Sequence, residues 1–128
     1  MKILGSHVSI EVEDIDKTFD YYTKIVGLKV IRKVSFDDGH RIIFFPGLEI
    51  HQMTSNKTVN NLKPYNLMHF GIEVENIESA VKELSKENNL PELEINEIVF
   101  KEIKQKVKYV LFKDNNGMEA ELAEWINI

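Results

Sequence analysis

The chain has 128 residues, enough for one compact domain and too few for two of ordinary size. Hydrophobic residues make up 43% and charged residues 29%, which is typical of a globular chain rather than a disordered one. The formal charge is −5 without any basic cluster, which argues against nucleic-acid binding. The lack of cysteine excludes disulfides, thiol catalysis and zinc–thiolate sites, and it fits the cytoplasm. With no run of eighteen apolar residues and no signal peptide pattern, we expect no membrane span.

Two segments of the chain resemble each other. Residues 7–28 and 69–90 align without a gap at an offset of 62, and eight of the 22 positions are identical. A shorter match aligns GLEIHQ (47–52) with GMEAEL (117–122), which sets His51 opposite Glu121. Two matches in the same order predict an internal duplication.

The first repeat begins with a predicted strand. Residues 6–13 alternate, with valine and isoleucine on one face and polar side chains on the other. Asp14 can cap a helix whose apolar stripe is Ile15, Phe19, Tyr22 and Val26, and Gly27 can end it. Three further strands follow, separated by turns at 37–39 and 46–47; they are expected near 29–36, 40–45 and 48–53.

The second repeat has the same predicted order. A polar linker at 54–66 leads to a strand at 67–75 and a helix at 77–88. The last three strands are expected at 94–100, 106–113 and 118–124. The predicted fold class is therefore α+β, a single domain of two tandem βαβββ modules near 5–53 and 67–124. We expect the two sheets to form a curved trough with the helices outside and the polar strand faces inside.

Histidine and carboxylate side chains recur at matching places in the repeats. His7 matches His69, and His51 matches Glu121, so we expect these four side chains to converge on one centre. Imidazole nitrogens with a carboxylate suit one divalent Zn, Ni, Fe, Mn or Co ion and leave a coordination position open for substrate. Glu49 and Glu119 lie two residues earlier on the same strand faces, and we expect them to line the rim, to orient a ligand or to be exposed strand ends. His40 has no counterpart in the second repeat and is expected at the surface.

These segments resemble the vicinal oxygen chelate superfamily, which includes glyoxalase I, bleomycin-binding proteins, fosfomycin-resistance thiol transferases and extradiol dioxygenases. The similarity is carried by HVSIEVEDIDKTFDYYTKIVGLKV, LEIHQM, MHFGIEVENIESAV and VLFKDNNGMEAELAE, and it covers nearly the whole chain. The resemblance implies a cytoplasmic homodimer that acts on a small molecule. It also implies one divalent metal ion, and the family's ligand positions fall on His7, His51, His69 and Glu121.

The function that the resemblance favours is that of a metal-dependent lyase or isomerase similar to lactoylglutathione lyase. The ion would act as a Lewis acid, and Glu121 would be both a ligand and the general base. Two residues depart from the glyoxalase I pattern, which typically has Glu where this chain has His51 and Arg where it has Glu11. Extradiol dioxygenase or thiol-transferase chemistry also stays open and would need only His7, His69 and Glu121. A non-catalytic antibiotic-binding protein would use the trough without chemistry.

Overall fold

The structure is a computed structural model that describes residues 1–53, 65–88 and 93–128. The chain divides into two compact units. The N-terminal unit comprises residues 7–68, and the C-terminal unit comprises residues 1–6 together with 69–128. Within the described residues, no helix is both long and apolar enough to cross a membrane.

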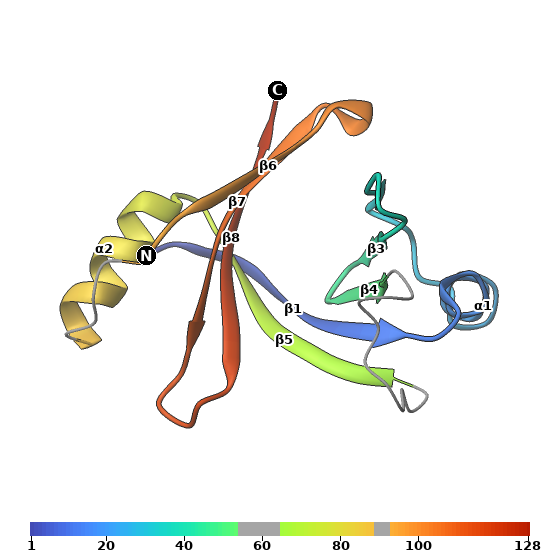
Figure 1. Ribbon diagram of the computed structural model, residues 1–128, viewed down its shortest axis with the longest axis horizontal. Helices are drawn as coiled ribbons and strands as arrows, with labels where there is room; N and C mark the ends of the chain where they lie inside the picture. The colour runs from blue at the N-terminus through green and yellow to red at the C-terminus, as the bar shows by residue number, and fades with distance from the viewer. Residues whose placement is uncertain (54–64, 89–92) are drawn as a thin grey trace. The chain divides into compact units, whose positions relative to one another are not determined.

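The N-terminal unit contains one βαβββ module (Figure 1). Its strands lie in the order β2-β3-β4-β1, with β1 and β4 parallel and the other pairs antiparallel. Its elements are β1 (Ile3–Val12), α1 (Ile15–Asp20), the π-helix η1 (Tyr21–Val26), β2 (Arg32–Ser35), β3 (Arg41–Phe45) and β4 (Leu48–Gln52).

The C-terminal unit repeats this order, with a short 3-10 helix added after its second strand. The start of β1 lies beside β5, where the Glu75 N–H donates to the Lys2 carbonyl over 3.0 Å, and the order continues β5-β8-β7-β6. The elements are β5 (Tyr65–Val74), α2 (Ile77–Asn88), β6 (Asn96–Phe100), η2 (Lys101–Ile103), β7 (Gln105–Lys113) and β8 (Glu119–Asn127). The α+β class and the repeated βαβββ order are therefore confirmed.

The structure describes only the end of the predicted linker, and it does not test the predicted trough. Residues 54–64 of the predicted linker lie outside the described residues, and its last two residues open β5. The placement of the two sheets as a trough stays a prediction.

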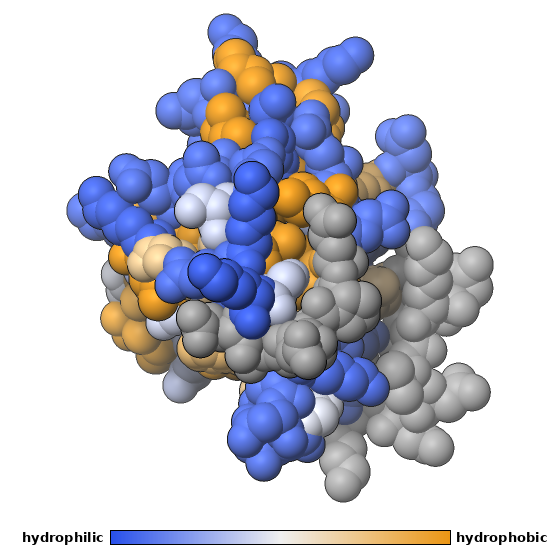
Figure 2. Space-filling model, turned by 90° about the vertical axis from the view of Figure 1, so that its left-hand side faces the viewer, coloured by the Kyte–Doolittle hydropathy of each residue, from blue (hydrophilic) through white to orange (hydrophobic). Residues whose placement is uncertain are grey.

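Each helix covers one face of its own sheet through an apolar core. Ile15 of α1 packs with Ile43, Phe45 and Ile50 of the N-terminal sheet, whereas Ile77, Ala80 and Val81 of α2 pack with Val74, Val110 and Leu122. The outward positions of α2 are polar, and Figure 2, seen from the side where α2 lies in Figure 1, shows mainly hydrophilic side chains with apolar ones between them. Burial of one helix face therefore holds each module together.

The two helices begin in equivalent ways. The Asp14 carboxylate accepts hydrogen bonds from the N–H groups of Asp16 and Lys17, and the Asn76 side chain accepts one from Ser79. In addition, a side chain of the last strand accepts a hydrogen bond from the first helical N–H. Gln52 does so for Ile15 over 2.8 Å, and Glu124 does so for Ile77 over 2.9 Å. Each helix is thus tied to the final strand of its own module through a backbone group that the helix leaves unpaired.

An ion pair beside each of these bonds also recurs. Asp16 of α1 accepts two hydrogen bonds from Arg41 of β3, at 2.9 and 3.1 Å, and Glu78 of α2 accepts one from Lys108 of β7 at 2.8 Å. The hydrogen bonds from Arg41, together with its charge, lower the pKa of Asp16. The hydrogen bond from Lys108 likewise lowers the pKa of Glu78.

The end of the first helix differs from the predicted α-helical stripe. Ile15 is buried and Phe19 and Tyr22 pack against the core as expected, but Val26 is half exposed, so its predicted place in the stripe was wrong. The cause is η1, because i→i+5 hydrogen bonding adds a residue to the turn and rotates the following positions away from the core. Gly27 ends the segment with a φ of 88°, as predicted.

Gln52→Leu should lower the free energy of unfolding by about 1–3 kcal/mol, since the N–H of the buried Ile15 loses its acceptor. Gln52→Glu is the matched control, because Glu124 fills the same role in the other unit, and it should keep most of the stability. Urea unfolding followed by circular dichroism measures both. Equal stabilities of the two variants would contradict this role.

The Asp16–Arg41 pair should make stability depend on pH. The folded-state pKa of Asp16 lies below its ordinary value of 3.8, so its contribution is present above that pH and is lost as the pH falls through the folded-state pKa. Asp16→Asn should therefore be less stable than the wild type at pH 7, and the difference should shrink by pH 3. Glu13→Gln, a change at an exposed position nearby, serves as the control in urea unfolding at both pH values.

Candidate functional site

The polar face of β1 is buried. His7, Ser9 and Glu11 alternate with Val8 and Ile10, as the sequence pattern predicts. Their exposed fractions are 8%, 0% and 5%, while Val8 on the helix-facing side is 38% exposed. Burial of polar side chains while a valine stays exposed is opposed by the hydrophobic effect. The polar face of β1 is therefore a candidate for ligand binding or catalysis.

In the N-terminal unit, the carboxylate of Glu49 lies between two imidazoles. Its Oε2 is 3.2 Å from Nε2 of His7, and its Oε1 is 2.6 Å from Nε2 of His51. The other ring nitrogen of His51, Nδ1, is 2.9 Å from Nε2 of His40. His7, Glu49 and His51 are all buried, so β1 and β4 together present an imidazole–carboxylate–imidazole group.

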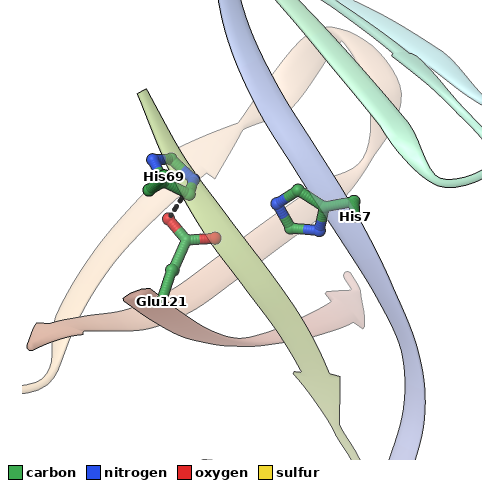
Figure 3. A group of neighbouring side chains, drawn as sticks. All are labelled: His7, His69 and Glu121. Atoms are coloured by element: carbon green, nitrogen blue, oxygen red, sulfur yellow. Dashed lines mark ion pairs between the residues drawn. The ribbon is translucent and has the colours of Figure 1, made fainter. Parts of the chain in front are cut away.

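In the C-terminal unit, β5 and β8 present a shorter version of this group. The Nε2 of His69 is 3.5 Å from Oε2 of Glu121, and Figure 3 shows the carboxylate of Glu121 directed toward that ring. His69 is 8% exposed, and Glu121 is partly buried. Each unit therefore places a histidine from its first strand beside a glutamate from its last strand.

The strand registers show which glutamates correspond. In the N-terminal unit Ser9 lies opposite Glu49, and in the C-terminal unit Gly71 lies opposite Glu121. Ser9 and Gly71 each follow the strand histidine by two residues, so they occupy the same place in the repeat. The counterpart of Glu121 is consequently Glu49. The pairing of His51 with Glu121, taken from the GLEIHQ and GMEAEL match, was wrong by two residues.

The length of the preceding hairpin explains this error. The β3–β4 pairing closes at Phe45 and Leu48 around a two-residue turn, whereas the β7–β8 pairing runs on to Lys113 and Glu119. Gly47 and Gly117 both have positive φ and are aligned with each other by the sequence match. However, Gly47 precedes Glu49 by two residues, whereas Gly117 precedes Glu121 by four. The hydrogen bonds at the helix starts agree with the match of Glu49 to Glu121, because their acceptors Gln52 and Glu124 each lie three residues after the matched glutamate.

One further position differs from expectation. His40 is half buried rather than at the surface, and it contacts His51 and stacks on Phe36 with ring centroids 4.9 Å apart. It precedes Ile42 by two residues, and Ile42 lies opposite His51, so alternation along β3 places His40 on the same sheet face. Glu119 is exposed, as the alternative of an exposed strand end predicted.

Comparisons with known proteins identify the family. A model described as the Glyoxalase/Bleomycin resistance protein/Dioxygenase superfamily matches residues 6–122. The probable trivalent organoarsenical cleaving enzyme of Bacillus subtilis (strain 168) is 28% identical over 76 residues, which are 59% of this chain. The match covers 49% of that relative, so the chain spans about half the length of the curated protein it resembles.

Solved structures share the fold at low sequence identity. Methylmalonyl-CoA epimerase from Mycobacterium tuberculosis superposes with a TM-score of 0.64 at 16% identity, over 95% of this chain and 88% of that one. A Streptomyces coelicolor methylmalonyl-CoA epimerase gives a TM-score of 0.68 at 13% identity, over 97% and 94%. With a family model that spans nearly the whole chain, this protein belongs to the glyoxalase/bleomycin resistance protein/dioxygenase superfamily.

Proposed function

We propose that this protein is a metal-dependent lyase or isomerase of the glyoxalase I type. In this proposal one divalent ion is held by His7, His69 and Glu121, the three side chains drawn in Figure 3, with Glu49 as a fourth ligand. The observation that carries the proposal is the matched register, which gives each unit one histidine and one glutamate at equivalent positions. A duplicated strand pair with donors at the same level is what a shared ion requires.

The chemistry of these residues fits a divalent cation. Two imidazoles and two carboxylates are ligands that Zn, Ni, Fe, Mn and Co accept. His7, His69 and Glu49 are each less than 10% exposed, and buried carboxylates need a compensating charge. Two carboxylates also balance the charge of a divalent ion, which a site with one carboxylate would not do.

His51 is the second possibility for the fourth ligand, as the sequence pattern predicted. Both of its ring nitrogens have partners, Glu49 on one side and His40 on the other. This contact pattern favours Glu49 as the ligand and His51 as the residue that orients it, as residues behind metal ligands commonly do. With Glu49 as the fourth ligand, the proposed site has the glutamate that glyoxalase I typically has. The departure from that pattern at His51 then no longer applies.

The two carboxylates suit proton transfer at a carbon beside a carbonyl. Glu121 would take the proton from one face of the substrate, and Glu49, its counterpart in the repeat, would return a proton on the other. The ion, when bound, would supply Lewis-acid polarisation of two vicinal oxygens. His51, 2.6 Å from Glu49, would hold that carboxylate in place.

Organoarsenical cleavage is a second candidate, and the similarity to the Bacillus subtilis relative favours it. Extradiol oxygenation would need only His7, His69 and Glu121, a set of two histidines and one carboxylate. Thiol transfer and the binding of an antibiotic without catalysis are two more functions that the family resemblance leaves open. A cytoplasmic homodimer also stays a prediction, and light scattering tests its assembly.

Metal titration separates the proposed ligands. His7→Ala, His69→Ala and Glu121→Ala should each weaken binding of cobalt(II) at least about tenfold, the loss typical of disturbing a metal site. Glu49→Ala should behave in the same way, while His51→Ala should retain a stoichiometric ion. Calorimetry and the visible spectrum of cobalt measure this. Loss of the ion in His51→Ala with retention in Glu49→Ala would make His51 the fourth ligand.

Removal of the ion should lower the melting temperature. A ligand bound only to the folded chain stabilises it by mass action, so wild-type protein loaded with one equivalent should melt higher than protein dialysed against a chelator. Glu121→Ala, which lacks a proposed ligand, should show a much smaller difference. Identical melting curves for loaded and chelated wild type would favour a binding protein without a metal ion.

Proton transfer can be tested with hydroxyacetone, which carries two vicinal oxygens. In D2O the metal-loaded wild type should exchange the carbon-bound protons next to the carbonyl, as followed by NMR. Glu121→Gln should slow this exchange by at least about a hundredfold, the effect typical of losing a general base. No exchange, together with release of inorganic arsenic from a trivalent methylarsenical, would instead support organoarsenical cleavage. No exchange together with oxygen uptake would support extradiol oxygenation.

A further inference from the structure

The side chain of Glu11 is buried without a hydrogen-bond partner for one of its carboxylate oxygens. It is 5% exposed, and its Oε1 is fully buried with no hydrogen bond among the described residues. Within residues 1–53, 65–88 and 93–128, no ion pair joins Glu11 to another side chain. Glu49, the other buried glutamate of this sheet, contacts two imidazoles. A buried carboxylate without compensation destabilises the folded chain, so its presence calls for a ligand or another reason.

Glu11 stands on the same strand face as the proposed ligand His7. The two residues are four positions apart, which corresponds to about 13 Å along an extended strand. The register sets Ser9 opposite Glu49 and Glu11 opposite His51, so Glu11 lies one step beyond the level of the proposed ligands. A substrate whose oxygens reach that level can therefore extend along β1 toward Glu11.

The charged and imidazole side chains of this sheet that lie near Glu11 have other partners. His51 lies opposite Glu11, but its two ring nitrogens contact Glu49 and His40. The carboxylate of Glu49 already has two imidazole partners, and the ion of the proposed function would balance Glu49 and Glu121. Arg32 is a cation on the same face, but it stands on β2, which β3 and β4 separate from β1, with its guanidinium 5.1 Å from the centre of the Phe44 ring. The negative charge of Glu11 is thus available to a ligand.

We propose that Glu11 recognises a cationic nitrogen group, an ammonium or a guanidinium, on the part of the substrate remote from the reacting oxygens. This inference rests on the proposed function for the position of the substrate. A carboxylate acceptor in a water-poor site pairs best with a charged N–H donor, and it repels another carboxylate. The substrate class is then a small vicinal-oxygen compound with a positively charged tail.

The first test uses metal-free protein, so that it does not depend on the ion. Isotope-labelled wild type is titrated with n-butylammonium and, separately, with butyrate, and NMR shifts are followed. Butylammonium should give saturable shifts on β1 and β4, and butyrate should not. Glu11→Gln should weaken the binding about tenfold or more, because a charge-assisted bond is lost. Glu13→Gln removes the same charge at an exposed position and should bind as the wild type does.

Stability gives a second readout on the same variants. If Glu11 is kept for a ligand, Glu11→Gln should melt at the same temperature as the wild type or higher, since an unpaired buried charge is removed. A lower melting temperature with unchanged butylammonium binding would show a structural role and overturn the inference. Should Glu11→Gln fail to fold, Glu11→Asp, which keeps the charge and shortens the side chain, should fold and bind butylammonium more weakly.

A third measurement uses ligands that would contact the metal ion and Glu11 at the same time. Cobalt-loaded protein is titrated with two catechols of similar size, 4-(2-aminoethyl)catechol and 3-(3,4-dihydroxyphenyl)propanoate. The ammonium compound should bind about tenfold tighter or more, and this preference should vanish in Glu11→Gln. Cobalt bound with equal catechol affinities would overturn this inference alone. Wild type that binds no cobalt would defeat the proposed function and leave the butylammonium result to decide on Glu11.

Discussion

The hydrogen bond between the first helical N–H and a side chain of the last strand is the contact on which each module depends. It joins Ile15 to Gln52 and Ile77 to Glu124, so it fixes the start of the helix relative to one residue of the final strand. The strand residue three positions earlier lies on the opposite face of the same strand. That residue is Glu49 in one unit and Glu121 in the other. A bond on the helix-facing side of the sheet therefore accompanies, three residues away, the glutamate that stands beside the strand histidine on the other side.

Each sheet divides its two faces between stability and chemistry. The helix-facing side supplies the apolar core, with Ile15 and Ile50 in one unit and Ile77 and Leu122 in the other, all essentially inaccessible to solvent. The opposite side carries buried polar groups that add little hydrophobic free energy. This separation lets the polar face change without loss of the core. It is consistent with the different polar sets of the two units, which include contacts between His40, His51 and Glu49 in one and the contact between His69 and Glu121 in the other.

Charge organises the polar face of the N-terminal sheet. Glu49 lies between two imidazoles, whereas Glu11, although it lies opposite His51, has a buried Oε1 with no hydrogen bond in the part of the chain that the structure describes. A buried carboxylate with partners can orient and transfer protons, and one without partners is poised to meet an external cation. Two glutamates on one sheet face thus have different proposed roles, and their surroundings rather than their residue type make the difference.

The sequence by itself determined the repeated architecture and most of the donors. Alternation along residues 6–13 and the gapless match at an offset of 62 predict the module order, both helix starts, and the equivalence of His7 and His69. These features depend on local periodicity and capping, which a short window of sequence contains. The positions of the cap Asp14 and of the final residue Gly27 follow from the same local rules.

Only the tertiary structure decided the counterpart of Glu121, the place of His40 and the direction of Val26. Glu49 corresponds to Glu121 because strand pairing, and not the letters around Gly47 and Gly117, sets the level of a residue in a sheet, and the two hairpins differ in length. The half-buried position of His40 results from pairing between β3 and β4. The exposure of Val26 results from a π-helical turn that no periodicity of 3.6 residues anticipates. Each of these three features depends on hydrogen bonds between backbone groups, and the amino-acid sequence does not directly show which backbone groups will pair.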